Sequence, residues 1–152
     1  MKGLGSVNDL IEDFAVLDDW EDRYRHVIEL GRDLEPLPEA SHVAANKVMG
    51  CASQVWIVAE TTGDPANPTL HFIGDSDALI VKGLIAIAFM IYSNRTARDI
   101  LATDAAAILA QLGLGEHLTP QRSNGFRSML ERIRSDARSA LQASSVAGMR
   151  GR

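Results

Sequence analysis

Residues 46–60 read NKVMGCASQVWIVAE and place the chain's only cysteine, Cys51, between two strand-like runs. The run from Gln54 to Glu60 is rich in β-branched and aromatic residues, which is typical of a strand covered on both faces. The residues around the cysteine are small, and Gly50 can adopt a positive φ without steric cost. The stretch therefore predicts a tight turn between two strands, with Cys51 at the tip of the loop.

The periodicity of the remaining chain predicts an α+β fold with a small three-stranded antiparallel sheet packed against several helices. The strands are expected at residues 41–49, 54–61 and 69–73. Helices are expected at residues 7–17, 19–31, 78–92, 96–101 and 104–112, with a long final helix that begins at Pro120. The 78–92 segment is apolar nearly all round, which indicates a buried central helix.

Single residues are expected to begin and end these helices. Gly31 and Gly113 fit C-caps, and Thr119 fits the N-cap of the final helix. Ser76 or Asp77 is a candidate cap for the central helix.

Length and composition favour one domain. We expect a single domain over residues 1–143 of the 152 and a flexible tail at 144–152, which is small, polar and basic. One cysteine cannot form an intramolecular disulfide and favours a reducing compartment. No basic and apolar leader is apparent at the start of the chain, so we expect a cytoplasmic location. The net charge of −5 argues against nonspecific nucleic-acid binding, and no segment is suited to a membrane.

Charge is distributed unevenly along the chain. Residues 1–40 carry eleven acids and four bases, whereas residues 120–152 carry seven arginines and two acids. Solvated helix faces explain this pattern simply. A polarised surface that steers docking to a protein partner is the sharper interpretation.

Four ordered segments resemble the SufE family of sulfur acceptors, which partner cysteine desulfurases in iron–sulfur cluster assembly. They read WExRY with IELG at 20–31, NKVxGCxSxVW at 46–56, GDSDAxIVKGL at 74–84 and LTPxRSNGF at 118–126. The likeness runs in order from about Asp9 to about Ala140 and implies a SufE/IscU-like architecture.

The resemblance implies that Cys51 accepts persulfide sulfur from a pyridoxal-phosphate-dependent cysteine desulfurase of the SufS or CsdA kind. The carrier would stimulate that enzyme and deliver sulfur to an iron–sulfur scaffold complex, as a monomer or weak homodimer. It would need no cofactor or metal of its own, since the cofactor belongs to the partner. In this family the loop is also thought to hold the cysteine in an apolar pocket at rest.

Other residues near these motifs are candidates for partner binding or for supporting the loop. Arg122 either lies near the cysteine loop or the desulfurase, or forms an ion pair with Asp75 or Asp77. The two aspartates either cap a helix or contact the partner. Lys47 favours the Cys51 thiolate if its side chain points toward the thiol. Gly50 completes this set through the turn that it permits.

Three rival interpretations of Cys51 remain. A lone cysteine beside apolar residues is often an inert buried hydrophobe, and the domain would then be a non-enzymatic partner-binding module. A cysteine hydrolase would require a histidine, for which the sequence offers His26, His42, His71 and His117. A zinc site would need three or four ligands, and no such spacing is present.

Overall fold

The computed structural model describes the backbone of residues 5–150 and the side chains of residues 5–143. Its elements are α1 (Val7–Val16), α2 (Trp20–Arg32), the 3₁₀ turns η1 (Glu39–Ser41) and η2 (Ala44–Asn46), β1 (Val55–Thr62), β2 (Thr69–Ser76), α3 (Leu79–Tyr92), β3 (Arg95–Thr96), α4 (Ala97–Ala102), α5 (Ala105–Leu112), α6 (Leu114–His117) and α7 (Pro120–Arg150). The predicted α+β class and three-stranded antiparallel sheet are confirmed, with strand order β1-β2-β3.

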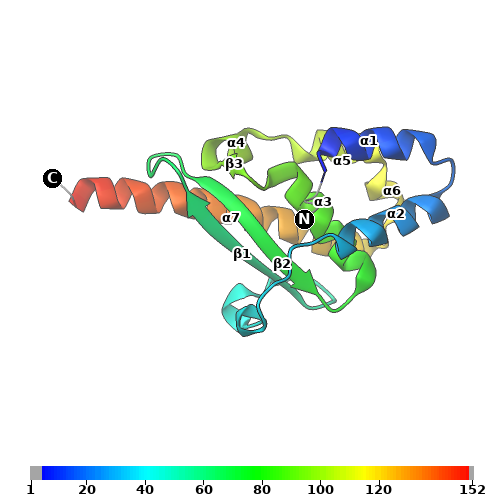
Figure 1. The fold of residues 1–152 in the computed structure, drawn as a ribbon, viewed down its shortest axis with the longest axis horizontal. Helices are drawn as coiled ribbons and strands as arrows, with labels where there is room; N and C mark the ends of the chain where they lie inside the picture. The colour runs from blue at the N-terminus through cyan, green and yellow to red at the C-terminus, as the bar shows by residue number, and fades with distance from the viewer. Residues whose placement is uncertain (1–4, 151–152) are drawn as a thin grey trace.

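The central helix α3 is the core of the molecule. Ten of its residues are buried, so that apolar side chains on nearly every face exclude water. It contacts α2, β2 and α7, and Figure 1 shows the β1–β2 hairpin crossing α7 while α1 and α2 lie at the opposite end of the molecule from the end of α7. The prediction of a buried central helix is therefore confirmed.

Two glycines set how closely α2 and α3 approach. A Cβ on Gly83 would lie 2.2 Å from the Val27 carbonyl oxygen, and one on Gly31 would lie 2.7 Å from the Gly83 nitrogen. Both distances are too short for any side chain to fit. The prediction that Gly31 ends α2 is wrong, because the helix continues to Arg32 and Asp33 is its C-cap. Gly31 serves helix packing instead.

The strand predicted at residues 41–49 is wrong. This segment forms η1, η2 and a single bridge between Lys47 and Trp56. Residues 43–45 are exposed and only Val48 is buried, so the segment has no apolar face to lay against the core. The third strand is instead β3, which pairs with the start of β2 at Thr69 and Leu70. The strands predicted at residues 54–61 and 69–73 are confirmed as β1 and β2, and each of them ends later in the chain than predicted.

The caps predicted at Thr119 and Gly113 are confirmed. Thr119 accepts a hydrogen bond from the Arg122 amide at 3.2 Å, and Gly113 ends α5 in the left-handed conformation. The caps predicted for α3 are wrong, because Ala78 is its N-cap residue and no side chain caps it. Helix α7 continues as backbone to Arg150, through most of the predicted tail. The side chains from residue 144 onward lie outside the described residues, so the flexible tail stays a prediction.

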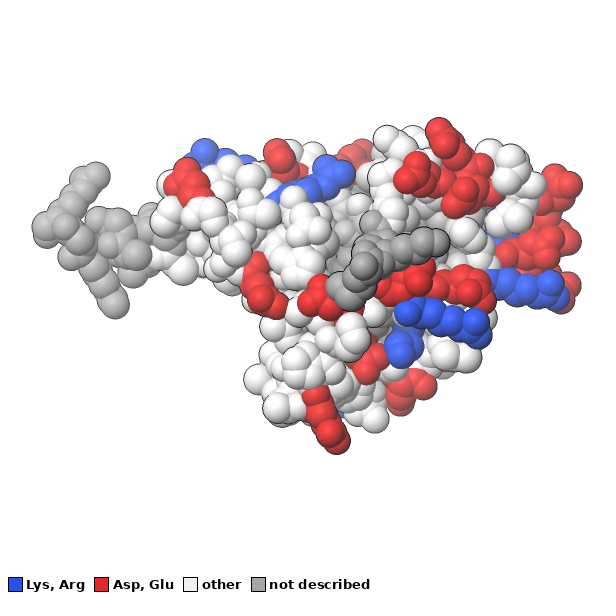
Figure 2. Space-filling view, in the orientation of Figure 1, with Lys and Arg blue, Asp and Glu red and all other residues white. Residues whose placement is uncertain are grey.

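The uneven charge of the sequence appears on the surface. Figure 2 shows Asp and Glu side chains gathered at the end of the molecule that α1 and α2 form. Among the described residues, no helix combines the length and apolar character needed to cross a membrane. A role for the acidic end in docking stays a prediction.

Candidate functional site

The tip of the cysteine loop, residues 49–53, rests on the first turns of α7. Gly50 has a φ of +89°, which confirms the turn predicted there, although no strand precedes it. A Cβ at this position would lie 2.6 Å from Ser128 Oγ, so the loop sits directly on the helix. The half-buried Cys51 directs its thiol to the Gly125 carbonyl oxygen, with an Sγ to oxygen distance of 3.5 Å.

A pocket of about 240 Å³ opens beside the thiol. Its lining comes from three parts of the fold: Cys51, Ala52 and Ser53 from the loop, Val81 and Leu84 from α3, and Thr119, Gln121, Arg122, Gly125 and Met129 from the α7 region. The α3 side chains are apolar and polar groups stand at the start of α7. Burial raises the pKa of the Cys51 thiol, so in this conformation the sulfur is protonated at neutral pH and weakly nucleophilic.

Hydrogen bonds anchor both ends of the loop, one to β1 and the other to the residue that follows β2. Upstream of the tip, the Val48 amide donates to the Val55 carbonyl at 2.8 Å. Downstream, the Gln54 amide donates to Asp77 Oδ1 at 3.1 Å. Asp77 therefore holds the loop and does not cap α3.

Arg132 of α7 adds a further anchor that sequence reasoning missed. Its guanidinium donates to the Lys47 carbonyl at 3.4 Å and to the Ile57 carbonyl at 3.3 Å, and also contacts Asp136 at 3.3 Å. β1 is an edge strand, so its outer carbonyls lack a neighbouring strand. An arginine one helical turn before an acid was the available signal, but its backbone targets lie 75 and 85 residues away.

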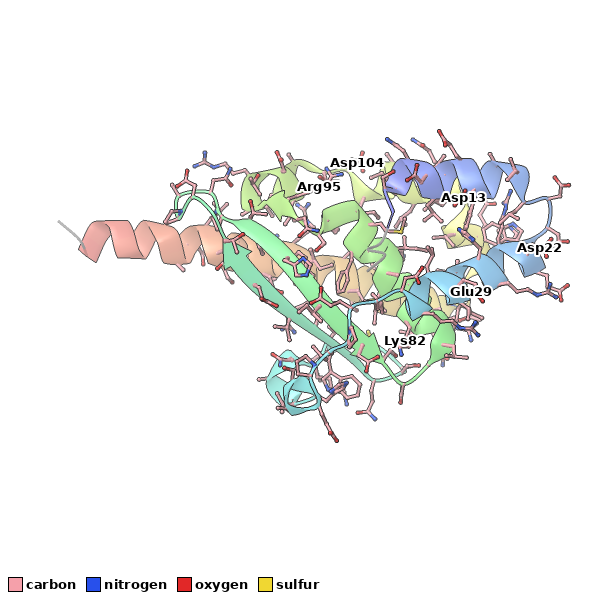
Figure 3. All side chains as sticks on the ribbon, viewed as in Figure 1. Asp13, Asp22, Glu29, Lys82, Arg95 and Asp104 are labelled. Atoms are coloured by element: carbon pink, nitrogen blue, oxygen red, sulfur yellow. The ribbon has the colours of Figure 1, made fainter. Side chains whose placement is uncertain are left out.

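Asp75 connects the segment before the cysteine loop, which contains His42, to the sheet and to α3. Its carboxylate accepts from His42 Nε2 at 2.8 Å and from the Ser76 amide at 2.8 Å, and lies 3.4 Å from Lys82 Nζ. Figure 3 labels Lys82 on α3, near the end of β2. Burial alone would raise the pKa of Asp75, but hydrogen bonds from His42 and the Ser76 amide, together with Lys82, hold it below its usual value.

The structure separates other candidates from the roles considered for them. Arg122 is exposed and lines the thiol pocket, but within residues 5–143 it forms no ion pair with Asp75 or Asp77. Lys47 is exposed, and burial is the cause of the Cys51 pKa shift. The Lys47 side chain thus has no part in lowering that pKa in this conformation.

The histidines considered for a hydrolase lie elsewhere. His26 faces Asp13, His42 binds Asp75, His71 binds Glu35 and Asn94, and His117 stacks on Trp20. The residues lining the thiol pocket include no histidine, so the base that a cysteine hydrolase requires is missing from it. No group of three or more His, Cys, Asp or Glu side chains in the described part of the chain is placed to hold a metal ion.

Comparisons with known proteins agree with the fold and with the family resemblance. A family model described as "SufE: Fe-S metabolism associated domain" matches residues 8–137. An uncharacterized SufE-like protein of Rhizobium etli is 56% identical over 135 residues, which cover 89% of this chain and 91% of that protein. Another, from Rhizobium meliloti, is 54% identical over 138 residues and covers 91% of this chain and 99% of its own.

A solved structure supports the fold alone. The solution structure of a hypothetical protein from Thermus thermophilus matches with a TM-score of 0.72. The match covers 93% of this chain and 99% of the other at 20% identity. At that identity the likeness concerns the path of the backbone and not the chemistry of the site.

Proposed function

The chain belongs to the SufE family of Fe–S metabolism, and from this membership we propose that Cys51 accepts persulfide sulfur from a cysteine desulfurase. The carrier stimulates the desulfurase by removing its sulfur and then delivers that sulfur for iron–sulfur cluster assembly. The observation that carries the proposal is the half-buried thiol of Cys51, held 3.5 Å from the Gly125 carbonyl oxygen beside a pocket.

The transfer is a displacement at sulfur. The Cys51 thiolate attacks the terminal sulfur of the persulfide on the partner's cysteine, and a new S–S bond forms as the old one breaks. The partner's cysteine leaves as a thiolate, and the terminal sulfur keeps its proton or charge. No external oxidant or reductant is required, since one persulfide is exchanged for another.

The resting geometry suits a carrier because it separates storage from reaction. The raised pKa keeps the thiol protonated while the loop is seated, so free disulfides and electrophiles react with it slowly. Moving the loop outward would return Cys51 to water and lower its pKa toward the ordinary thiol value. The pocket of about 240 Å³ leaves room for one additional sulfur atom when the loop returns.

The surface around the loop offers contacts for a partner. Met49, beside the tip, is 79% exposed, and Leu79, in the first turn of α3, is 60% exposed. Exposed apolar side chains mark a protein-binding surface where they lie together in one patch, and we propose that these two do. We assign docking of the desulfurase to this surface, with the exposed cations Lys47 and Arg122 at its border.

Intact mass spectrometry tests the proposal. The protein is incubated with a cysteine desulfurase and free cysteine, and its mass is measured before and after a thiol reductant is added. We expect a gain of one or more sulfur atoms that the reductant removes. Cys51→Ser is the matched control and should gain none.

The partner-binding module remains the competing function, because a half-buried cysteine can also serve packing alone. A module would leave desulfurase stimulation unchanged in Cys51→Ser, whereas a carrier would lose it. Absence of added sulfur with desulfurases of both the SufS and the CsdA kind would refute sulfur acceptance.

A further inference from the structure

His42 has oxygen acceptors on both sides of its ring. Nδ1 lies 3.1 Å from the Pro38 carbonyl oxygen and 3.3 Å from that of Glu39, while Nε2 lies 2.8 Å from Asp75 Oδ2. A neutral imidazole carries one N–H, so one ring nitrogen would direct a lone pair at an oxygen. Only the imidazolium donates on both sides. The arrangement is therefore built for the protonated form.

The surroundings of His42 support this assignment. The ring packs edge-on against Trp56 of β1, with centroids 4.8 Å apart, and the side chain is 24% exposed. Among the described residues of β2, the charged group that faces it is Asp75, and from α3 Lys82 lies on the other oxygen of that carboxylate. β1 contributes the uncharged indole. The carboxylate that His42 meets is thus shared with one permanent cation.

The contact bears on Cys51 through the chain that leads to the loop. Residues 38–48, the upstream arm, run from the carbonyls that bind His42 to Val48, immediately before the tip. Beyond the His42 contact this arm is held by the Val48 to Val55 hydrogen bond at 2.8 Å, by the buried Val48 side chain and by Arg132 on the Lys47 carbonyl at 3.4 Å. An arm with so few backbone bonds opens locally more often when one anchor is lost.

We propose that His42 is a positioning residue for Cys51, whose imidazolium fastens the upstream arm to the end of β2 and whose deprotonation lets the cysteine loop open. This inference concerns loop opening and is independent of sulfur acceptance. Its use to the protein rests on the proposed function, since an opened loop presents the thiol to a partner.

The sign of the pH dependence follows from the contacts. The hydrogen bond to Asp75 is the main cause that raises the pKa of His42 above its ordinary value, against a smaller opposing effect of burial. A raised pKa means that the contact contributes fully below about pH 6.5 and is lost as the pH rises through the folded-state value. The opening window therefore lies above about pH 6.5.

The test compares the reaction of Cys51 with a chromogenic disulfide in the full chain and in His42→Arg, across acidic to basic pH. Both proteins carry the same thiol, so the rate of the full chain divided by that of the variant reports the loop opening that depends on His42. Arginine keeps the positive charge at every pH. We expect the rate of the full chain divided by that of His42→Arg to be near one in acid and to rise roughly three- to tenfold as the pH increases. This is the effect of losing one modest hydrogen bond on a local opening equilibrium. The midpoint should match the His42 titration measured by NMR.

A second variant and a second readout keep the proposal falsifiable. Asp75→Asn removes the carboxylate and should raise the acid-side rate of Cys51 above that of the unmodified chain. Hydrogen exchange at the Val48 amide should speed up with pH beyond the intrinsic rate in the unmodified chain and not in His42→Arg. The inference would be overturned by a rate ratio that stays constant with pH, or by hydrogen exchange at the Val48 amide that has the same pH dependence in the unmodified chain and in His42→Arg. Either result would do so even if sulfur acceptance were established.

Discussion

Replacing Gly125 with valine should drive Cys51 out of its resting position. A Cβ built on Gly125 has three nearest neighbours, which are the Sγ, Cα and Cβ atoms of Cys51 at 3.6, 3.7 and 3.8 Å. The perturbation therefore falls first on the cysteine loop. Alanine at this position makes ordinary van der Waals contacts, whereas the two additional methyl groups of valine extend about 1.5 Å farther into the loop.

The expected magnitude follows from what holds the thiol. The seated Cys51 has one hydrogen bond to Gly125, and its pKa is raised by burial alone. Displacing the loop restores solvation, so the pKa falls toward the ordinary thiol value, and each unit of that fall raises the thiolate fraction about tenfold. We expect Gly125→Val to react with a chromogenic disulfide at neutral pH roughly three to ten times faster than the unmodified chain.

Gly125→Ala is the matched control. It should keep the slow reaction and gain about 0.5–1 kcal/mol of stability, since alanine is the better helix former. The pH profile of the reaction should shift to lower pH in the valine variant only. If both variants react at the rate of the unmodified chain while remaining folded by circular dichroism, Cys51 is not seated against Gly125 and our account of its pKa fails.

Three further perturbations test other contacts. Gly83→Ala should lower the free energy of unfolding, measured by chemical denaturation, by about 3 kcal/mol. The reason is that its Cβ would lie 2.2 Å from the Val27 carbonyl oxygen and force α2 and α3 apart. An unchanged denaturation midpoint would contradict that close packing. Arg132→Ala should lower the free energy of unfolding by about 1–3 kcal/mol and accelerate labelling of Cys51, since two backbone carbonyls and a half-buried carboxylate lose their donor. An unchanged stability and an unchanged labelling rate would show that Arg132 does not anchor the loop. NMR should find the pKa of His71 raised by its hydrogen bonds, first to Asn94 and then to Glu35. The stability that these contacts contribute is therefore present in acid and lost as the pH rises through that pKa. Glu35→Gln should lower the His71 pKa, and an unchanged pKa would refute the pairing.

Local sequence signals predicted the elements whose stability is local. The apolar run of α3, the Thr119 cap and the Gly113 stop each act within a few residues, and each appears as expected. The strand predicted at residues 41–49 fails because strand formation requires a partner and a covered face, and only Val48 is buried there. The two-residue strand β3 carries no pattern of its own and exists through its pairing with β2.

The candidate site divides in the same way. The sequence identified Cys51, the Gly50 turn and the SufE motifs, and these led to the family that the comparisons established. It did not identify Arg132 or Ser128, and it offered His42 only as one histidine among four. Each of these residues acts on a group far along the chain, which no local pattern encodes.

By itself, then, the sequence determined the class of fold, the cysteine at a loop tip and the family. Only the tertiary structure decided that the Cys51 thiol meets the Gly125 carbonyl, 74 residues away, and that Asp75 binds His42, 33 residues away, instead of Arg122. The physical reason is the range of the forces involved. Helix and turn preferences act over a few residues, whereas the partner of a side chain depends on how packed elements approach, as at Gly83 where α2 meets α3.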